Sequence, residues 1–101
     1  MRRLEFSQLA EDDLEAIAEY IARDNPGKAV EFVREIRAHC LRIASNPLAY
    51  RIRPDLDKDV RSCAFGKYVI YFDIDGPMVL ILRIQHGARD RHANWVHDEP
   101  S

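Results

Sequence analysis

The side chains best suited to chemistry gather where one apolar strand ends. Met78–Leu82 are apolar without interruption, and the chain then runs through Arg83, His86 and Arg89. Histidine can exchange a proton near neutral pH, and arginine can hold a phosphate or a carboxylate. We therefore expect this end of the strand either to act on a phosphate or to bind an acidic partner.

The candidate binding residues for a partner or target are all basic side chains: Arg61, Arg83, His86, Arg89 and Arg91. Arg83 interrupts an apolar strand, where a guanidinium is costly unless it meets an acidic group. For Arg61 and Arg91, a solvated edge with weak surface ion pairs is an equally good interpretation. His86 and His92 are the possible acid–base groups, although no partner carboxylate is identifiable for either. No catalytic residue is therefore assigned.

The cysteines and histidines do not predict a metal or a cofactor. Cys40 and Cys63 are far apart and neither belongs to a CxxC motif, so we expect two reduced thiols that behave as apolar side chains. The four histidines lack metal-ligand spacing supported by cysteine or paired carboxylates. We expect neither a metal site nor a bound cofactor.

Length and composition describe one ordinary globular domain. The 101 residues suffice for a single core, and 47% of them are hydrophobic and 32% charged. The net charge of -2 excludes a global basic field for nonspecific nucleic-acid binding. The longest apolar run is too short for a membrane span, and the N-terminus lacks the apolar segment of a signal peptide. A cytoplasmic protein is expected.

The N-terminal half predicts a short strand followed by two helices. Leu4 and Phe6 alternate with charged residues, and Ser7 can cap a helix whose first turns are acidic. Asp24–Gly27 interrupts the helical spacing, with Pro26 suited to begin the second helix. Asn46-Pro47 ends that helix. The break is short, so the two helices should form an antiparallel hairpin.

The C-terminal half predicts a loop and then three strands. Leu48–Asp59 is polar, whereas Val60–Phe65, Tyr68–Asp73 and Met78–His86 are strand-like and joined by tight turns. The fold class is α+β: an N-terminal strand and a helix hairpin packed on a small antiparallel sheet with a C-terminal three-stranded meander. Residues 1–101 form one domain, with 91–101 as a tail whose order the sequence leaves open.

Strict alternation divides the last strand into two faces. One face would carry Met78, Leu80, Leu82 and Ile84, and the other Val79, Ile81, Arg83 and Gln85. The second set contains the charge, so we expect it to lie away from the helices. That face would remain partly apolar, which on a small domain indicates an interaction surface.

In this arrangement the chain resembles the ParE branch of the RelE/ParE toxins of bacterial toxin–antitoxin systems, which include plasmid stabilisation proteins. The similarity covers most of residues 3–90, and it depends on an ordered series of short motifs. These are Phe6-Ser7, Ala10, Asp13-Leu14, Ile17, Tyr20-Ile21, Asn25-Pro26, Ala29, Phe32, Asn46-Pro47, Val60-Arg61, Phe65–Tyr71 and His86–Asp90.

The resemblance implies a stable hetero-oligomer with a ParD-like antitoxin, whose dimeric part would bind DNA. The toxin would then contact DNA only through the antitoxin. For the ParE branch the implied target is DNA gyrase, stalled on cleaved DNA. For the RelE branch the implied activity is cleavage of messenger RNA on the ribosome.

The residues expected of a RelE-type ribonuclease are largely absent. Val69 follows Tyr68 where an arginine would stand, the segment Val60–Cys63 lacks the expected lysine pair, and Trp95 lies near the late acid–base position. Ribonuclease chemistry needs groups that transfer protons and stabilise phosphate charge. We therefore expect a toxin that inhibits gyrase by binding. The alternatives are a ribosome-dependent endoribonuclease and a non-toxic member that acts with its antitoxin in autoregulation.

Overall fold

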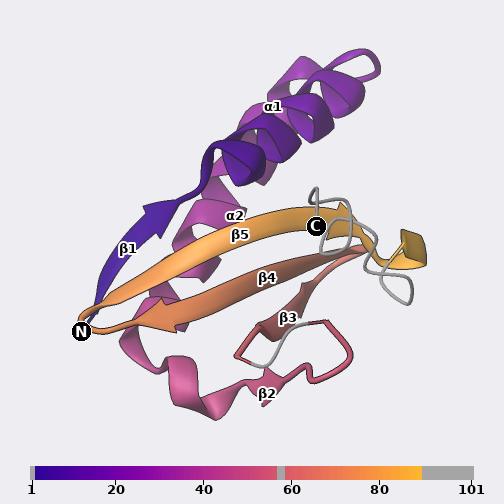
Figure 1. The fold of residues 1–101 in the computed structure, drawn as a ribbon. Helices are drawn as coiled ribbons and strands as arrows, with labels where there is room; N and C mark the ends of the chain where they lie inside the picture. The colour runs from indigo at the N-terminus through magenta and orange to yellow at the C-terminus, as the bar shows by residue number, and fades with distance from the viewer. Residues whose placement is uncertain (1, 57–58, 90–101) are drawn as a thin grey trace.

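The computed structural model describes residues 2–56 and 59–89 (Figure 1). Along the chain the elements are β1 (Arg3–Phe6), α1 (Gln8–Ala22), α2 (Pro26–Ser45), the 3₁₀ turn η1 (Pro47–Ala49), β2 (Arg51–Ile52), β3 (Arg61–Phe65), β4 (Tyr68–Asp75), β5 (Met78–His86) and the 3₁₀ turn η2 (Gly87–Arg89). None of the helices in these ranges is long and apolar enough to cross a membrane.

The five strands form one sheet in the order β1-β5-β4-β3-β2. The predicted α+β class and the β3-β4-β5 meander are confirmed. The sheet is mixed rather than wholly antiparallel, because β1 pairs in parallel with β5. Parallel neighbours need a long connection between them, and here the helix hairpin and the other strands supply it. Over Met78–Ile81, β5 therefore has a neighbouring strand on each side, β1 and β4.

Local capping chemistry sets the beginning of both helices, and the predicted cap at Ser7 and the predicted start of the second helix at Pro26 are confirmed. The Ser7 hydroxyl accepts a hydrogen bond from the Ala10 N–H at 3.0 Å, and the Asn25 side chain accepts one from the Lys28 N–H at 3.1 Å. Pro26 follows as the first residue of α2, where its missing N–H is not needed. These caps let α1 turn back into α2 as a hairpin.

The helix hairpin covers one face of the sheet and forms the main core with it (Figure 1). The buried members of this core are Ala10, Leu14, Ile36, Cys40, Ile43, Ala44, Ile70, Phe72, Val79, Ile81 and Ile84. Burying so many aliphatic and aromatic side chains in one cluster is the main source of stability.

A β-bulge in β5 makes the predicted division of its faces wrong. Tyr71 pairs with Arg83 whereas the next residue, Phe72, pairs with Ile81, so Leu82 has no partner on β4. The bulge shifts the alternation by one position. Val79 and Ile81 are therefore fully buried in the helix-covered core instead of lying on the open face.

The opposite face of the sheet has a cover of its own. The predicted loop of residues 48–59 begins within η1 and contains the short β2, and after β2 the side chains of Leu56 and Val60 lie against the sheet. Leu56 and Val60 pack on Tyr71, whose side chain has no exposed surface. The expected open apolar face is thus partly covered by the chain itself, and an interaction surface must be sought elsewhere.

Candidate binding groove

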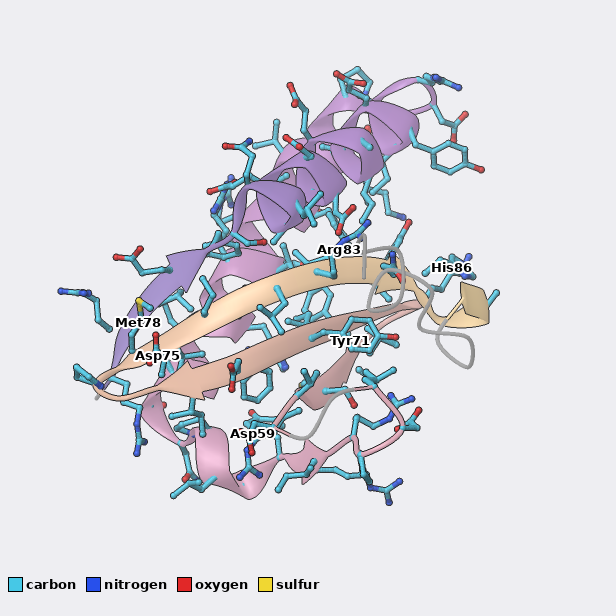
Figure 2. The ribbon with its side chains drawn as sticks, in the orientation of Figure 1. Asp59, Tyr71, Asp75, Met78, Arg83 and His86 are labelled. Atoms are coloured by element: carbon cyan, nitrogen blue, oxygen red, sulfur yellow. The ribbon has the colours of Figure 1, made fainter. Side chains whose placement is uncertain are left out.

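A surface groove of about 560 Å³ lies between α1 and the C-terminal end of β5. Figure 2 shows Arg83 and His86 at this end of the sheet, with Arg83 directed toward α1. The groove is lined by Asp13, Ala16, Ile17, Tyr20, Lys67, Tyr68, Arg83, Ile84, Gln85, His86 and Ala88.

One face of α1 forms the first wall. Asp13, Ile17 and Tyr20 are spaced at i, i+4 and i+7, which places their side chains in one row along the helix. Tyr20 is the most exposed of the large hydrophobic side chains in the described residues, at 69%. This wall changes from a carboxylate that is only 16% exposed at one end to an exposed aromatic ring at the other.

An ion pair between Asp13 and Arg83 joins the two walls. Arg83 Nε donates to Asp13 Oδ2 at 2.8 Å, and Nη2 donates to Oδ1 at 3.0 Å. The two side chains are only 16–17% exposed. A bidentate contact of this kind is short, charge-assisted and geometrically specific. The guanidinium that interrupts the apolar strand therefore has its acidic partner within the chain.

Side chains from the start of α1 also complete the edge of β5. β1 ends opposite Ile81, and beyond that point the Ser7 hydroxyl donates to the Leu82 carbonyl at 2.8 Å. The Ile84 N–H donates to Asp13 Oδ2 at 3.0 Å. The backbone N–H and C=O groups along an exposed strand edge lack hydrogen-bond partners within the sheet. Here the side chains of Ser7, which caps α1, and of Asp13 supply the missing hydrogen-bond partners and fix the position of β5 against α1.

The second wall ends in a turn held by backbone contacts. The Gly87 N–H donates to the Lys67 carbonyl at 2.7 Å, and the Ala88 N–H donates to His86 Nδ1 at 3.1 Å. The His86 ring also meets Tyr68 edge-to-face, with centroids 5.6 Å apart. Because Nδ1 accepts a hydrogen bond, a neutral His86 carries its proton on Nε2. Lys67 adds a cation at this rim.

The structure brings together only part of the predicted site. Arg83 and His86 both line the groove, and η2 carries the backbone of Arg89 to its rim. Arg61 lies on β3, separated from β5 by β4, and donates to the Tyr50 carbonyl at 2.7 Å. Arg91 lies outside the described residues.

Most of the groove lining was missed from the sequence, including three polar or aromatic side chains suited to binding: Asp13, Tyr20 and Lys67. The signal for Asp13 was its position beside the apolar stripe of α1, where an acid should be costly without a partner. Tyr20 continues the same row of side chains. Lys67 carried no signal, because a lysine in a tight turn is ordinary.

A second cluster of reactive side chain types lies between α2 and β3. His39 Nε2 lies 3.1 Å from Cys63 Sγ. Burial and nearby Arg42 lower the pKa of His39, and burial raises the pKa of Cys63. Burial also raises the pKa of Cys40 to about 12. Both cysteines are free thiols that stay protonated at neutral pH, so this pair lacks the thiolate that a nucleophile requires.

The arrangement of the groove suits binding. Its described lining mixes apolar and polar side chains, Lys67 stands at one end, and the Asp13–Arg83 ion pair, largely shielded from water, is internal to the chain. In residues 2–56 and 59–89 no three histidine, cysteine, aspartate or glutamate side chains are grouped so that they could hold a metal ion.

Comparison with known proteins places this fold among the small toxins of toxin–antitoxin systems. The chain is similar to a chain from the chromosomal ParDE toxin–antitoxin system of P. aeruginosa, with 26% identity and a TM-score of 0.74 over 85% of this chain and 96% of that one. It also shares its fold with a chain of the RelBE2 toxin–antitoxin complex of Mycobacterium tuberculosis, at 20% identity and a TM-score of 0.60, covering 84% and 96%. Among curated proteins none matches.

The family model for the ParE toxin of the type II toxin–antitoxin system parDE matches residues 4–91. The chain therefore belongs to the ParE toxin family, as its motifs indicated. The match includes both helices, the described lining of the groove and all five strands except Arg3, the first residue of β1.

Proposed function

We propose that this ParE toxin acts in the cytoplasm by binding DNA gyrase and is neutralised by a ParD-like antitoxin. The observation that carries the proposal is the commitment of Arg83 to Asp13 in a bidentate pair. A guanidinium whose charge is balanced inside the protein is poorly placed to stabilise a phosphate in a transition state. The residue that looked most like a catalytic arginine thus supports the fold of the groove instead.

The state of His86 supports binding over catalysis as well. Its Nδ1 accepts a hydrogen bond from the Ala88 N–H, and among the described residues that line the groove the one carboxylate is that of Asp13, which holds Arg83. Ribonuclease chemistry requires a proton acceptor and a proton donor placed around the scissile phosphate. The groove lining does not provide that combination.

An antitoxin partner is supported by the family and by the character of the groove. The similar P. aeruginosa chain comes from a ParDE toxin–antitoxin system. The groove offers apolar surface from Ile17 and Tyr20 and positive charge from Lys67, a combination that suits an amphipathic acidic segment. In this proposal His86 and Arg89 contact the partner directly, whereas Arg83 acts by positioning β5. Arg61 and Arg91 stay candidates for a second contact.

Expression of the toxin without its antitoxin tests the target. We expect filamentation and a DNA-damage response, because a stalled gyrase leaves cleaved DNA, and we expect purified toxin to inhibit supercoiling by gyrase. Co-expression of the antitoxin encoded beside it should abolish both effects. Rapid arrest of translation with cut transcripts would instead assign the toxin to the ribonucleases, and normal growth would leave a role in autoregulation only.

Substitution of Arg89 by alanine separates binding from folding. Arg89 is the last residue of η2, and we expect the variant to keep the wild-type free energy of unfolding within about 0.5 kcal/mol, as most substitutions outside a core do. Its affinity for the antitoxin or for gyrase should fall by roughly tenfold, the size expected for a lost charged contact. Binding by calorimetry and unfolding by urea measure the two quantities. Unchanged affinity for both partners would show that Arg89 is only solvated surface.

A further inference from the structure

We propose that the antitoxin binds this toxin through one amphipathic helix that packs along a second, exposed apolar stripe of α1. One flank of that helix is basic and the other is acidic. The inference rests on the proposed function, in which an antitoxin binds the toxin, and it adds the surface and the charge pattern of the segment that is recognised.

α1 carries two apolar stripes, although one is enough to attach a helix to a core. The first stripe faces the sheet and contains the buried Ala10 and Leu14. The second contains Leu9, Ala16 and Tyr20, whose spacing of i, i+7 and i+11 brings them to one side of the helix. All three are exposed, Leu9 at 52% and Tyr20 at 69%. An exposed row of apolar side chains beside a groove indicates an interaction surface.

The exposed stripe of Leu9, Ala16 and Tyr20 has the length and spacing that a partner helix requires. From Leu9 to Tyr20 the helix rises about 16 Å, or roughly three turns. With Asp13 the row follows the alternating spacing of four and three residues by which two helices pack against each other. The Asp13 carboxylate is directed to Arg83, so its charge is balanced within the chain. The small Ala16 side chain lets a second helix approach closely.

Charges of opposite sign flank the exposed stripe. On the side away from the core, Asp12 and Glu19 are exposed, and no basic residue lies within α1. Asp12 accepts a hydrogen bond from the Gln8 amide, which is a neutral group and balances no charge. On the side toward the end of β5, Lys67 lines the same groove as Tyr20. The two flanks of the stripe therefore differ in the sign of their charge.

A helix on this stripe meets acids along one flank and a lysine on the other. Its seam should be apolar, to cover Leu9 and Tyr20. Lysine or arginine should lie on the flank beside Asp12 and Glu19, and aspartate or glutamate on the flank beside Lys67. This charge pattern fixes which side of the partner helix faces the groove.

Calorimetry of the full-length toxin with the antitoxin encoded beside it tests the seam. Leu9→Ala and Tyr20→Ala should each weaken the affinity about tenfold, because both remove apolar surface from the middle of the contact. Tyr20→Phe keeps the ring and should retain the wild-type affinity. Val30→Ala is the matched control, since Val30 is an exposed side chain of α2 outside the stripe. Circular dichroism of these variants should match the wild type, because the replaced side chains are exposed.

Charge reversal tests the two flanks separately. Lys67→Glu and Glu19→Lys should each weaken the antitoxin affinity about tenfold at low salt. The difference from the wild type should shrink at high salt, because ions screen exposed charges. Arg34→Glu reverses an exposed charge on α2, outside both flanks, and should change the affinity less than either variant.

Several results would overturn this docking surface and leave antitoxin binding itself in place. Wild-type affinity in both seam variants would place the antitoxin elsewhere, and indifference to both charge reversals would contradict the charge pattern. Unchanged antitoxin affinity with loss of gyrase inhibition in Tyr20→Ala would assign the stripe to gyrase. Self-association of the free toxin that Tyr20→Ala abolishes, again with unchanged antitoxin affinity, would assign it to a second copy. If the wild-type toxin did not bind the antitoxin, the proposed function itself would fail.

Discussion

Replacing Asp13 by alanine is expected to lower the free energy of unfolding by about 3–5 kcal/mol, a large share of the roughly 5–15 kcal/mol that stabilises a folded domain. The carboxylate accepts two hydrogen bonds from Arg83 and one from the Ile84 N–H, in a site where both charged side chains are largely shielded from water. Its removal leaves the guanidinium without these contacts and leaves an N–H at the strand edge without its acceptor. Urea unfolding followed by circular dichroism measures the loss.

The chain contains a matched control for this prediction. Glu11 and Arg37 also form an ion pair between side chains, at 2.9 Å, but both are 43% exposed. Glu11→Ala should therefore cost no more than about 1 kcal/mol, because solvent screens the attraction. The double variant Asp13→Leu, Arg83→Met should recover much of the stability lost in Asp13→Ala, since a pair of apolar side chains leaves no charge buried. Equal effects of Asp13→Ala and Glu11→Ala would contradict the burial argument.

The Asp13–Arg83 ion pair also changes how an effect of Arg83→Ala on toxicity must be interpreted. Arg83→Ala should destabilise the protein and loosen both walls of the groove, so a loss of toxicity in that variant would not identify a contact with the target. Arg89→Ala, which leaves the Asp13 pair intact, is the cleaner probe. Comparing the two variants separates a residue that positions the groove from one that faces a partner.

Features set by neighbouring residues were predictable from the sequence. Ser7 and Asn25 cap their helices through contacts only three residues away, and the turn at Gly76 needs only a positive φ of 58°. The meander follows from two tight turns between apolar strands. The helix hairpin and the three C-terminal strands could accordingly be assigned without the structure.

Features set by distant residues were not predictable in this way. The Asp13–Arg83 pair joins positions 70 residues apart, and the parallel pairing of β1 with β5 spans nearly the whole chain. The bulge at Leu82 has no local signature, because Leu80, Ile81 and Leu82 are interchangeable in an apolar run. For the site, Arg83 and His86 were placed correctly at one strand end. The groove itself could not be inferred, since its first wall comes from α1.

Replacing Phe72 by alanine is the second change for which we expect a large effect, a loss of about 3–5 kcal/mol from transfer and cavity terms together. Phe72 is fully buried at the centre of the main core and meets Tyr50 edge-to-face, with centroids 5.8 Å apart. Because 1 kcal/mol shifts the melting temperature of such a domain by about 4–8 °C, the variant should melt about 12 °C or more below the wild type. Leu48→Ala, at a side chain that is 63% exposed, is the control and should change little.

The Phe72→Ala variant also tests the link between folding and the partner. A partner that binds only the folded toxin stabilises it by mass action, and the gain grows with the concentration of free partner. The variant should therefore be poorly soluble when expressed alone and recover folded protein when the antitoxin is co-expressed, with a melting temperature that rises as antitoxin is added. If the antitoxin raised neither the yield nor the melting temperature of the variant, it would have no preference for this folded surface. If Phe72→Ala melted with the wild type, the helix-covered core would not be what holds α1 against β5, and the groove between them would need another support.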